Sequence, residues 1–374
     1  MRTTMRTSFI PVLAFLSAGV LCPTAVLAEP VKIVSWNMGP RLLEGLESRA
    51  NDIEAMNEAL APDVVVLIEV AGLNEARRIA ELLGWPDYFG AVTNWSTMIN
   101  QVNFALETAV ISKIPIERVV EFDASVDGLH SAFSNSDPED AAVPVDEKLL
   151  SSTGISGVNP LARSDRGTMR VDLENGLTIY PVHLKSNRND WCFRAESAVG
   201  ELQDLGFEPP EGLADLFDNG FAKATDEHKL NAIKRERVLA ATKVSADKAK
   251  AEGRIVVIAG DYNTALEPGK AGSAFADCTL ANFSCAKAPF PAAACTGGDG
   301  FDDTLAILTA PLVADAQWSL LSKDLPRTYD DSAFADRAID HIAVPADQAA
   351  RFSTAERADE AFGSDHFPIF VIFE

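Results

Sequence analysis

The chain has 374 residues, of which 47% are hydrophobic, and a formal net charge of −23 at pH 7. This length is sufficient for one large domain with an extensive core. So acidic a chain is ill-suited to tight, non-specific binding of nucleic acid or anionic membranes. A nuclease is not excluded, because a local basic groove still acts within a Debye length of about 10 Å.

The first 28 residues have the pattern of a secretory signal peptide. Arg2 and Arg6 precede an apolar stretch, and the Val-Leu-Ala sequence at 26–28 provides a small-residue cleavage site. The alternative is a membrane anchor, but the apolar stretch is shorter than the roughly 20 residues that a span requires. We therefore expect residues 29–374 to be exported to the periplasm or the cell exterior, without stable membrane insertion.

Apolar periodicity predicts the elements that follow. A continuous β-branched run at 63–68 indicates a strand buried on both faces. Asn175 and Gly176 provide the two-residue turn of a hairpin with arms at 168–173 and 177–184. The other expected elements are helices at 53–60, 73–83 and 226–251 and strands at 31–36, 104–111, 254–259, 337–344 and 367–373.

Strands interleaved with helices, together with a hairpin, do not fit a purely parallel sheet. The order favours an α/β fold of the α+β type, with two mixed β-sheets packed face to face and helices outside. Periodicity is lost near 125–163, 190–222 and 265–315, which we interpret as loop insertions in a single domain over 29–374.

Four cysteines remain after cleavage of the signal peptide, at 192, 278, 285 and 295. An even number in an exported chain predicts two disulfides, with three ways to pair them. Zinc binding is the alternative, but the spacing contains no Cys-x-x-Cys and no nearby histidine.

Polar residues stand where the apolar strands end, and this is the main functional signal of the sequence. A metal-binding or titratable group has no reason to end a core strand unless the strand ends converge. Carboxylates, histidines and asparagines in one pocket indicate divalent-metal chemistry on phosphate. The residues concerned are Asn37, Glu69, His183, Asp261, Asn263, Asp340, Asp365 and His366.

The segments around these residues resemble the endonuclease/exonuclease/phosphatase superfamily, which includes pancreatic-type deoxyribonucleases, abasic-site endonucleases, neutral sphingomyelinases and inositol polyphosphate 5-phosphatases. The resemblance spans nearly the whole exported chain and implies a four-layer α/β sandwich with Mg²⁺- or Mn²⁺-dependent hydrolysis of a phosphate ester. It is carried by SWN at 35–37, the strand-terminal Glu69, VHLKS at 182–186, GDYN at 260–263, IDHI at 339–342 and SDHFP at 364–368.

The resemblance and the chemistry of the side chains together suggest roles. Glu69 and Asp365 would hold the metal, and Asn37 would support the metal or bind the phosphate. Asp261 and Asn263, which share one face if the chain stays extended, would contact the nucleophile and the transition-state oxygens.

A histidine–carboxylate pair is expected to move the proton. His366 would be the general base, and Asp340 would orient its ring. His183 would stabilise the departing oxygen. His341 should point away from Asp340 by strand alternation and pack elsewhere.

Basic and acidic residues outside these segments leave alternatives open. Arg166 is the candidate phosphate clamp, with Arg163 and Arg170 as competitors, and Lys185, Arg188 and Arg194 either line a substrate groove or are solvated. Asp299, Asp302 and Asp303 either bind a structural Ca²⁺ or form an acidic solvent loop.

We therefore predict an exported phosphodiesterase, with a nuclease acting on DNA or RNA as the first hypothesis. A phosphomonoesterase or lipid-headgroup phosphodiesterase is the alternative, and a binding module without catalysis is the third. The sequence indicates no protein partner.

Overall fold

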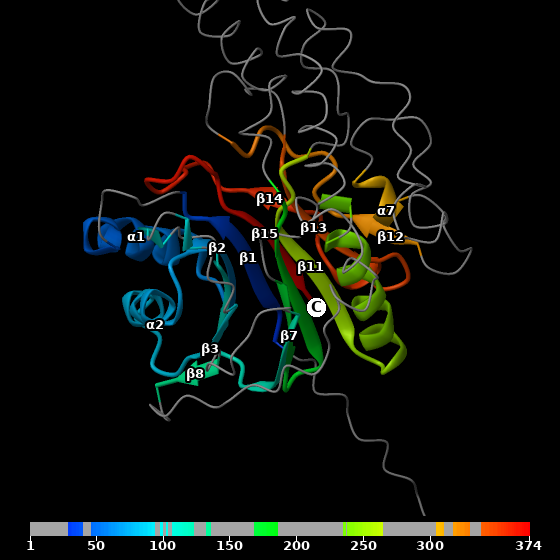
Figure 1. Cartoon of the computed structure of the whole chain (residues 1–374), viewed down its shortest axis with the longest axis horizontal. Helices are drawn as coiled ribbons and strands as arrows, with labels where there is room; N and C mark the ends of the chain where they lie inside the picture. The colour runs from blue at the N-terminus through cyan, green and yellow to red at the C-terminus, as the bar shows by residue number, and fades with distance from the viewer. Residues whose placement is uncertain are drawn as a thin grey trace, which may run out of the picture.

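The computed structural model describes residues 29–39, 46–93, 98–99, 102–103, 107–122, 132–135, 168–185, 235–236, 238–264, 304–309, 317–329 and 338–374. Within these ranges the chain forms two large mixed β-sheets with helices on their outer faces (Figure 1). A separate two-stranded sheet consists of β4 (Met98–Ile99) and β5 (Val102–Asn103).

The first sheet has seven strands in the order β14-β15-β1-β2-β6-β3-β8. Its central strands β1 and β2 are parallel, and the other neighbouring strands pair antiparallel. The strands are β1 (Val31–Asn37), β2 (Val64–Val70), β3 (Phe89–Val92), β6 (Glu107–Ser112), β8 (Ala132–Ser134), β14 (Glu356–Arg357) and β15 (Ile369–Phe373).

The second sheet has six strands in the order β12-β13-β11-β10-β9-β7. Here β10 and β11 are the parallel pair, and β9 and β10 form the hairpin predicted around Asn175 and Gly176. The strands are β7 (Ile116–Phe122), β9 (Thr168–Leu173), β10 (Leu177–His183), β11 (Ile255–Asp261), β12 (Trp318–Leu320) and β13 (Asp340–Pro345).

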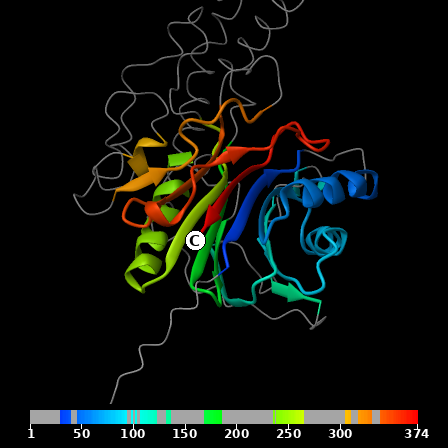
Figure 2. The same ribbon diagram turned by 180° about the vertical axis from the view of Figure 1, so that it is seen from behind.

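Helices complete four layers. In Figure 1, α1 (Ala50–Leu60) and α2 (Leu73–Leu82) cover the outer face of the first sheet. The helical residues 238–251 cover the outer face of the second sheet, as Figure 2 also shows from behind. The short elements are η1 (Leu46–Arg49), α7 (Ala306–Thr309) and η8 (Ala349–Arg351).

Three apolar cores lie between these layers. Alternate residues of a strand belong to different cores, because successive side chains point to opposite faces of a sheet. Val64, Val66 and Ile68 of β2 pack between the two sheets, while Val65 and Leu67 pack against α1 and α2. The third core joins the second sheet to the 238–251 helix. Burial on both faces explains the unbroken apolar runs, and the predicted fold class is confirmed.

The strands that sequence reasoning missed are short or lie at a sheet edge. Ala132–Ser134 forms β8, the edge strand beside β3, inside the stretch expected to be a surface loop. Three residues are too few to show a strand period, so only pairing with β3 reveals this one. Residues 1–28, the four remaining cysteines and the aspartates at 299, 302 and 303 lie outside the described residues. Among the described helices, none has the length and apolarity needed to span a membrane.

Candidate active site

The carboxyl ends of the two parallel strand pairs carry the predicted site residues. Asn37 ends β1 and Glu69 is the last residue but one of β2 in the first sheet, and His183 and Asp261 end β10 and β11 in the second. His183 and Asp261 are paired across the β10–β11 ladder. All four side chains point into the space between the two sheets, so residues of both sheets meet at one site.

Three polar contacts, each with one partner from each sheet, join the two halves. Asn37 Nδ2 donates to Asp261 Oδ2 at 3.0 Å, and Glu69 Oε1 lies 3.6 Å from His183 Nε2. His366, which precedes β15, pairs through Nδ1 with Asp340 Oδ2 at 2.8 Å. Asn37, His183, Asp261, Asp340 and His366 are each at most 5% exposed. Buried polar groups of this kind require partners, and here they partner one another.

A β-bulge aims Glu69 at the second sheet. The β2–β6 register passes from Ile68 to Val70 and skips Glu69, whose φ is 65°. Regular alternation would turn residue 69 to the helix side, as with Leu67. Because the bulge gives that side to Val70, the carboxylate of Glu69 reaches His183 instead. A glutamate with positive φ is uncommon, and strained backbone of this kind clusters at active sites and ligand-binding turns.

Asp261 and Asn263 meet through a turn. We expected extended backbone to place them on one face, but the strand ends at Asp261 and Asn263 has a φ of 52°. Asp261 Oδ1 accepts from the Asn263 backbone N–H at 2.8 Å, and Asn263 Nδ2 donates to Asp261 Oδ2 at 2.9 Å. This local turn brings both side chains to the site. Gly260 is required there, since a Cβ would lie 1.9 Å from the carbonyl oxygen of Val182.

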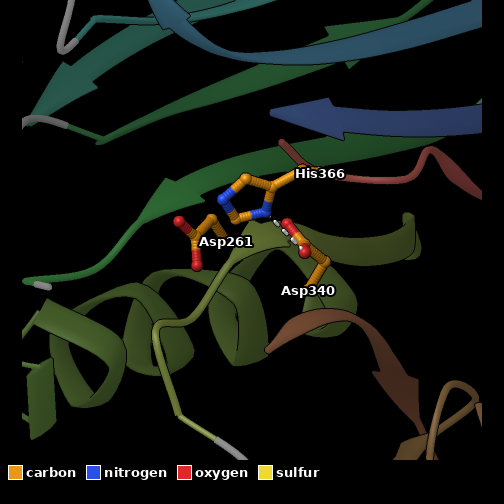
Figure 3. A group of neighbouring side chains, drawn as sticks. All are labelled: Asp261, Asp340 and His366. Carbon is orange, nitrogen blue, oxygen red and sulfur yellow. Dashed lines mark hydrogen bonds and ion pairs between the residues drawn. The ribbon is translucent and has the colours of Figure 1, made fainter. Parts of the chain in front are cut away.

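The His366–Asp340 pair has the geometry of a proton-transfer dyad. Nδ1 of His366 faces the Asp340 carboxylate (Figure 3). Its Nε2 lies 3.4 Å from the Asn37 amide nitrogen. Burial lowers the pKa of His366, but the charges of Asp340, Asp261 and Asp365 outweigh burial and raise it to about 10. The surrounding negative charge therefore favours the protonated ring, and a positive charge added to this site would favour the neutral one.

Supporting residues that sequence reasoning missed fix the dyad. The hydroxyl of Thr328, which is fully buried, accepts from the backbone N–H groups of Ile339 at 3.0 Å and Asp340 at 3.1 Å. The ring of Tyr329 packs edge-on at 4.8 Å from that of His366. Thr328 and Tyr329 stand ten or more residues from the IDHI segment, so no local pattern announces them.

His341 packs away from the site, as predicted. Its Nε2 faces the carbonyl oxygen of Thr264 and its Nδ1 faces the hydroxyl of Ser322, both at 3.0 Å. Burial lowers its pKa to about 4. His341 is therefore a neutral residue of the outer core that supports the segment after Asn263.

Two neighbouring sets of side chains could hold a cation. Within the described residues, ligand atoms of Asp261, Asp340 and His366 all lie within 4.8 Å of one another (Figure 3). Two members of this set, His366 and Asp340, already pair with each other through His366 Nδ1. The predicted set of Glu69, Asp365 and Asn37 offers oxygens alone, which Mg²⁺ prefers.

Two members of the second set present oxygens that suit a cation. Glu69 is 15% exposed and so retains a path to solvent. The Asn37 side-chain oxygen accepts from the Gly39 backbone N–H at 3.0 Å, which leaves a second lone pair. The four carboxylates of the site, two of them buried and two half-buried, outnumber its two histidines and carry an excess of negative charge that a divalent ion would offset.

Of the candidate phosphate clamps, the structure describes only Arg170. Arg170 is buried and bonded to Asp172 at 2.8 Å and to Glu252 at 2.6 Å, so it stabilises the second sheet and is no clamp. Arg163, Arg166, Arg188 and Arg194 lie outside the described residues. Lys185 follows β10, and its carbonyl oxygen accepts from Arg235 at 2.8 Å.

No protein-family model and no curated protein matches the chain. Similar solved structures include the AP endonuclease LMAP from Leishmania major, at 13% identity and a TM-score of 0.48, over 92% of this chain and 88% of that one. Another is the 3′ phosphatase NExo from Neisseria with a product DNA hairpin (13%, TM-score 0.47, 92% and 99%). A Leptotrichia buccalis structure, described as an endonuclease/exonuclease/phosphatase family protein, matches at 13% (TM-score 0.46, 92% and 99%).

Proposed function

We propose that this protein is an exported, divalent-cation-dependent hydrolase of phosphate esters that cleaves phosphodiester bonds as a nuclease. The observation that carries the proposal is the His366–Asp340 pair at 2.8 Å, buried beside Asp261 and Asn37 with Glu69 and His183 across from them. A proton acceptor, an oriented carboxylate and oxygen ligands for a hard cation then stand at one point, as water attack on phosphorus requires.

The proposed reaction is in-line displacement. Nε2 of His366 takes a proton from water while the water oxygen bonds to phosphorus, and Asp340 holds the ring and stabilises the imidazolium. The bond from phosphorus to the leaving oxygen breaks, that oxygen takes a proton from water, and His366 returns its own proton to solvent. His183, 3.7 Å from Asp261 Oδ2, faces this developing charge from the second sheet.

Asp261 and Asn263 position the attacking water. The Asn37 and Asn263 amides both donate to Asp261 Oδ2, at 3.0 and 2.9 Å, and leave its carboxylate fixed at the centre of the site. Fixed dipoles of this kind need no reorganisation during the reaction.

Glu69 and Asp365, with the Asn37 side-chain oxygen, would hold the cation. A bound Mg²⁺ or Mn²⁺ would neutralise phosphate charge and the excess charge of the carboxylates, which favours the neutral, accepting form of His366.

Substrate and location rest on the sequence. The Arg-containing, apolar segment at 1–28 supports export, and Lys185 with the basic residues that follow it supports a polyanionic substrate. The net charge of −23 opposes non-specific polyanion binding and keeps phosphomonoesters and lipid headgroups as the alternative.

One screen tests the proposal. Purified protein is incubated with Mg²⁺ or Mn²⁺ and plasmid DNA, RNA, sphingomyelin or inositol phosphates, beside His366→Ala and an EDTA control. Plasmid or RNA cleavage by the wild type alone is expected. Phosphate release from small esters with intact nucleic acid would replace the nuclease by a phosphomonoesterase, and inactivity on every substrate would refute the hydrolase.

A further inference from the structure

Arg49, at the end of η1, is a buried arginine outside every motif discussed above. It is 5% exposed, and its guanidinium donates to the carbonyl oxygens of Met38 and, at 3.0 Å, of Phe362. The guanidinium also lies 5.6 Å from the centre of the Trp36 ring. Burying a guanidinium is costly unless it is hydrogen-bonded, and here two of its nitrogens donate to two backbone segments.

Those two segments carry the site residues. Met38 follows Asn37, and Phe362 begins the 362–366 turn, which contains Asp365 and His366. The two segments are far apart in sequence but lie at the same end of the first sheet. Met38 follows the last residue of β1, and the 362–366 turn precedes β15, which pairs antiparallel with β1. One side chain therefore links the two stretches of chain whose relative position sets the distance from Asn37 to His366.

The 362–366 turn depends on such links. Phe362 has a φ of 50°, a conformation that a residue other than glycine rarely adopts without support, and Gly363 follows it at 71°. Asp52 crowds Gly363, where a Cβ would lie 2.2 Å from a carboxylate oxygen. Arg49 Nε in turn lies 3.8 Å from Asp52 Oδ2, so the helix start and the turn are bound together.

A second link runs parallel to the first. The Ser364 hydroxyl donates to the Asn37 carbonyl oxygen at 2.7 Å and accepts from the His366 backbone N–H at 3.0 Å. Arg49 therefore fixes the start of the turn and Ser364 its middle, and His366 follows directly.

We propose that Arg49 is a positioning residue, which holds the 362–366 turn against the end of β1 so that His366 and Asp365 face Asn37 and Asp261. The proposal rests on the proposed function for its effect on catalysis, and on the hydrogen bonds alone for its effect on the His366 ring.

Arg254 provides a matched control. It also donates to two backbone carbonyl oxygens, those of Leu173 at 2.7 Å and Leu177 at 2.8 Å. It precedes β11 at the end opposite Asp261, so its loss should cost stability without moving the site.

The experiment compares Arg49→Lys, Arg49→Met and Arg254→Lys, each at a temperature where thermal unfolding shows it folded. A lysine keeps the charge but cannot span both carbonyls. We expect kcat to fall about 100-fold in Arg49→Met, with partial recovery in Arg49→Lys and little change in KM, because misplacement of a reacting group by about 1 Å has that effect. Arg254→Lys should keep the wild-type kcat.

A readout without substrate separates the two proposals. The chain has five histidines, so protein labelled with ¹³C at histidine gives few ring signals, and His366→Gln assigns the one of interest. The His366 signal should shift in both Arg49 variants and stay fixed in Arg254→Lys. If the wild type hydrolyses no phosphate ester, the proposed function fails. The shift of the His366 signal still tests whether Arg49 positions His366. An unmoved signal with wild-type kcat overturns the role of Arg49. Should Arg49→Lys not fold, Ser364→Ala removes the parallel link and carries the same expectation.

Discussion

Gly39→Ala tests the assignment of Asp365 as a cation ligand, because Gly39 lies directly against that carboxylate. A Cβ at position 39 would stand 2.7 Å from Asp365 Oδ1, where ordinary contact begins at 3.4 Å. The oxygen must therefore move by about 0.7 Å, the difference between these distances. Mg²⁺ binds at about 2.0–2.1 Å in near-ideal octahedral geometry, so such a shift should raise the Mg²⁺ concentration for half-maximal activity by roughly tenfold or more.

The backbone contributes a separate penalty that must be subtracted. Gly39 has a φ of 72°, and an alanine in this region costs about 1–2 kcal/mol. Gly84→Ala is the matched control, since Gly84 has a φ of 66° and a Cβ added there would meet nothing within 4 Å. Both variants should lose similar stability in thermal unfolding, but only Gly39→Ala should change the Mg²⁺ titration of activity. Equal Mg²⁺ dependence in the two variants would refute Asp365 as a ligand.

Three further predictions concern the dyad, the cation and pH. Asp340→Asn should lower kcat on the order of 10²–10⁴-fold in steady-state assays, since it removes the negative charge that stabilises the imidazolium beside His366 Nδ1 and allows the amide NH₂ to select the wrong tautomer; unchanged kcat would exclude the dyad. EDTA should abolish activity and lower the Tm, and added Mg²⁺ should restore both in a concentration-dependent way; a Tm indifferent to EDTA would contradict a resident cation. Burial lowers the pKa of His341 from 6.5 to about 4, so below pH 6.5 the unfolded state binds a proton that the folded state does not. Stability should thus fall by about 3 kcal/mol between pH 6.5 and 4 through this group. The free energy of unfolding of His341→Gln, measured with urea, should not show that loss. If it falls with pH in parallel with that of the wild type, His341 is not the cause.

The sequence predicts the two-sheet architecture because strands buried on both faces leave continuous apolar runs. It predicts the strand-end residues for a related reason, since Asn37 or Asp261 after such a run is conspicuous. It does not predict the bulge at Glu69 or the turn at Asn263. Both depend on backbone with positive φ at residues other than glycine, which propensity disfavours and only tertiary contacts maintain.

Supporting residues were the least predictable part of the site. Thr328 and Arg49 act through backbone groups, Thr328 by accepting from Asp340 N and Arg49 by donating to Phe362 O. A hydrogen bond to a backbone group does not require a particular side chain on the partner residue. The sequence around the partner therefore gives no sign that the bond exists. Only the spatial arrangement of strand ends, turns and η1 identifies these residues.

The site depends on the inter-sheet core as much as on its own side chains. Its three polar links each join the first sheet, or the turn that leads into β15, to the second sheet. They are Asn37 to Asp261, Glu69 to His183 and His366 to Asp340. None of them survives if the sheets slide or separate, because strand alternation points Asn37, His183, Asp261 and Asp340 along the same face as the apolar residues between the sheets. The bulge brings Glu69 to that face as well. Close packing there resists small displacements. The apolar face that stabilises the fold is therefore also the element that holds the two halves of the proposed active site in register.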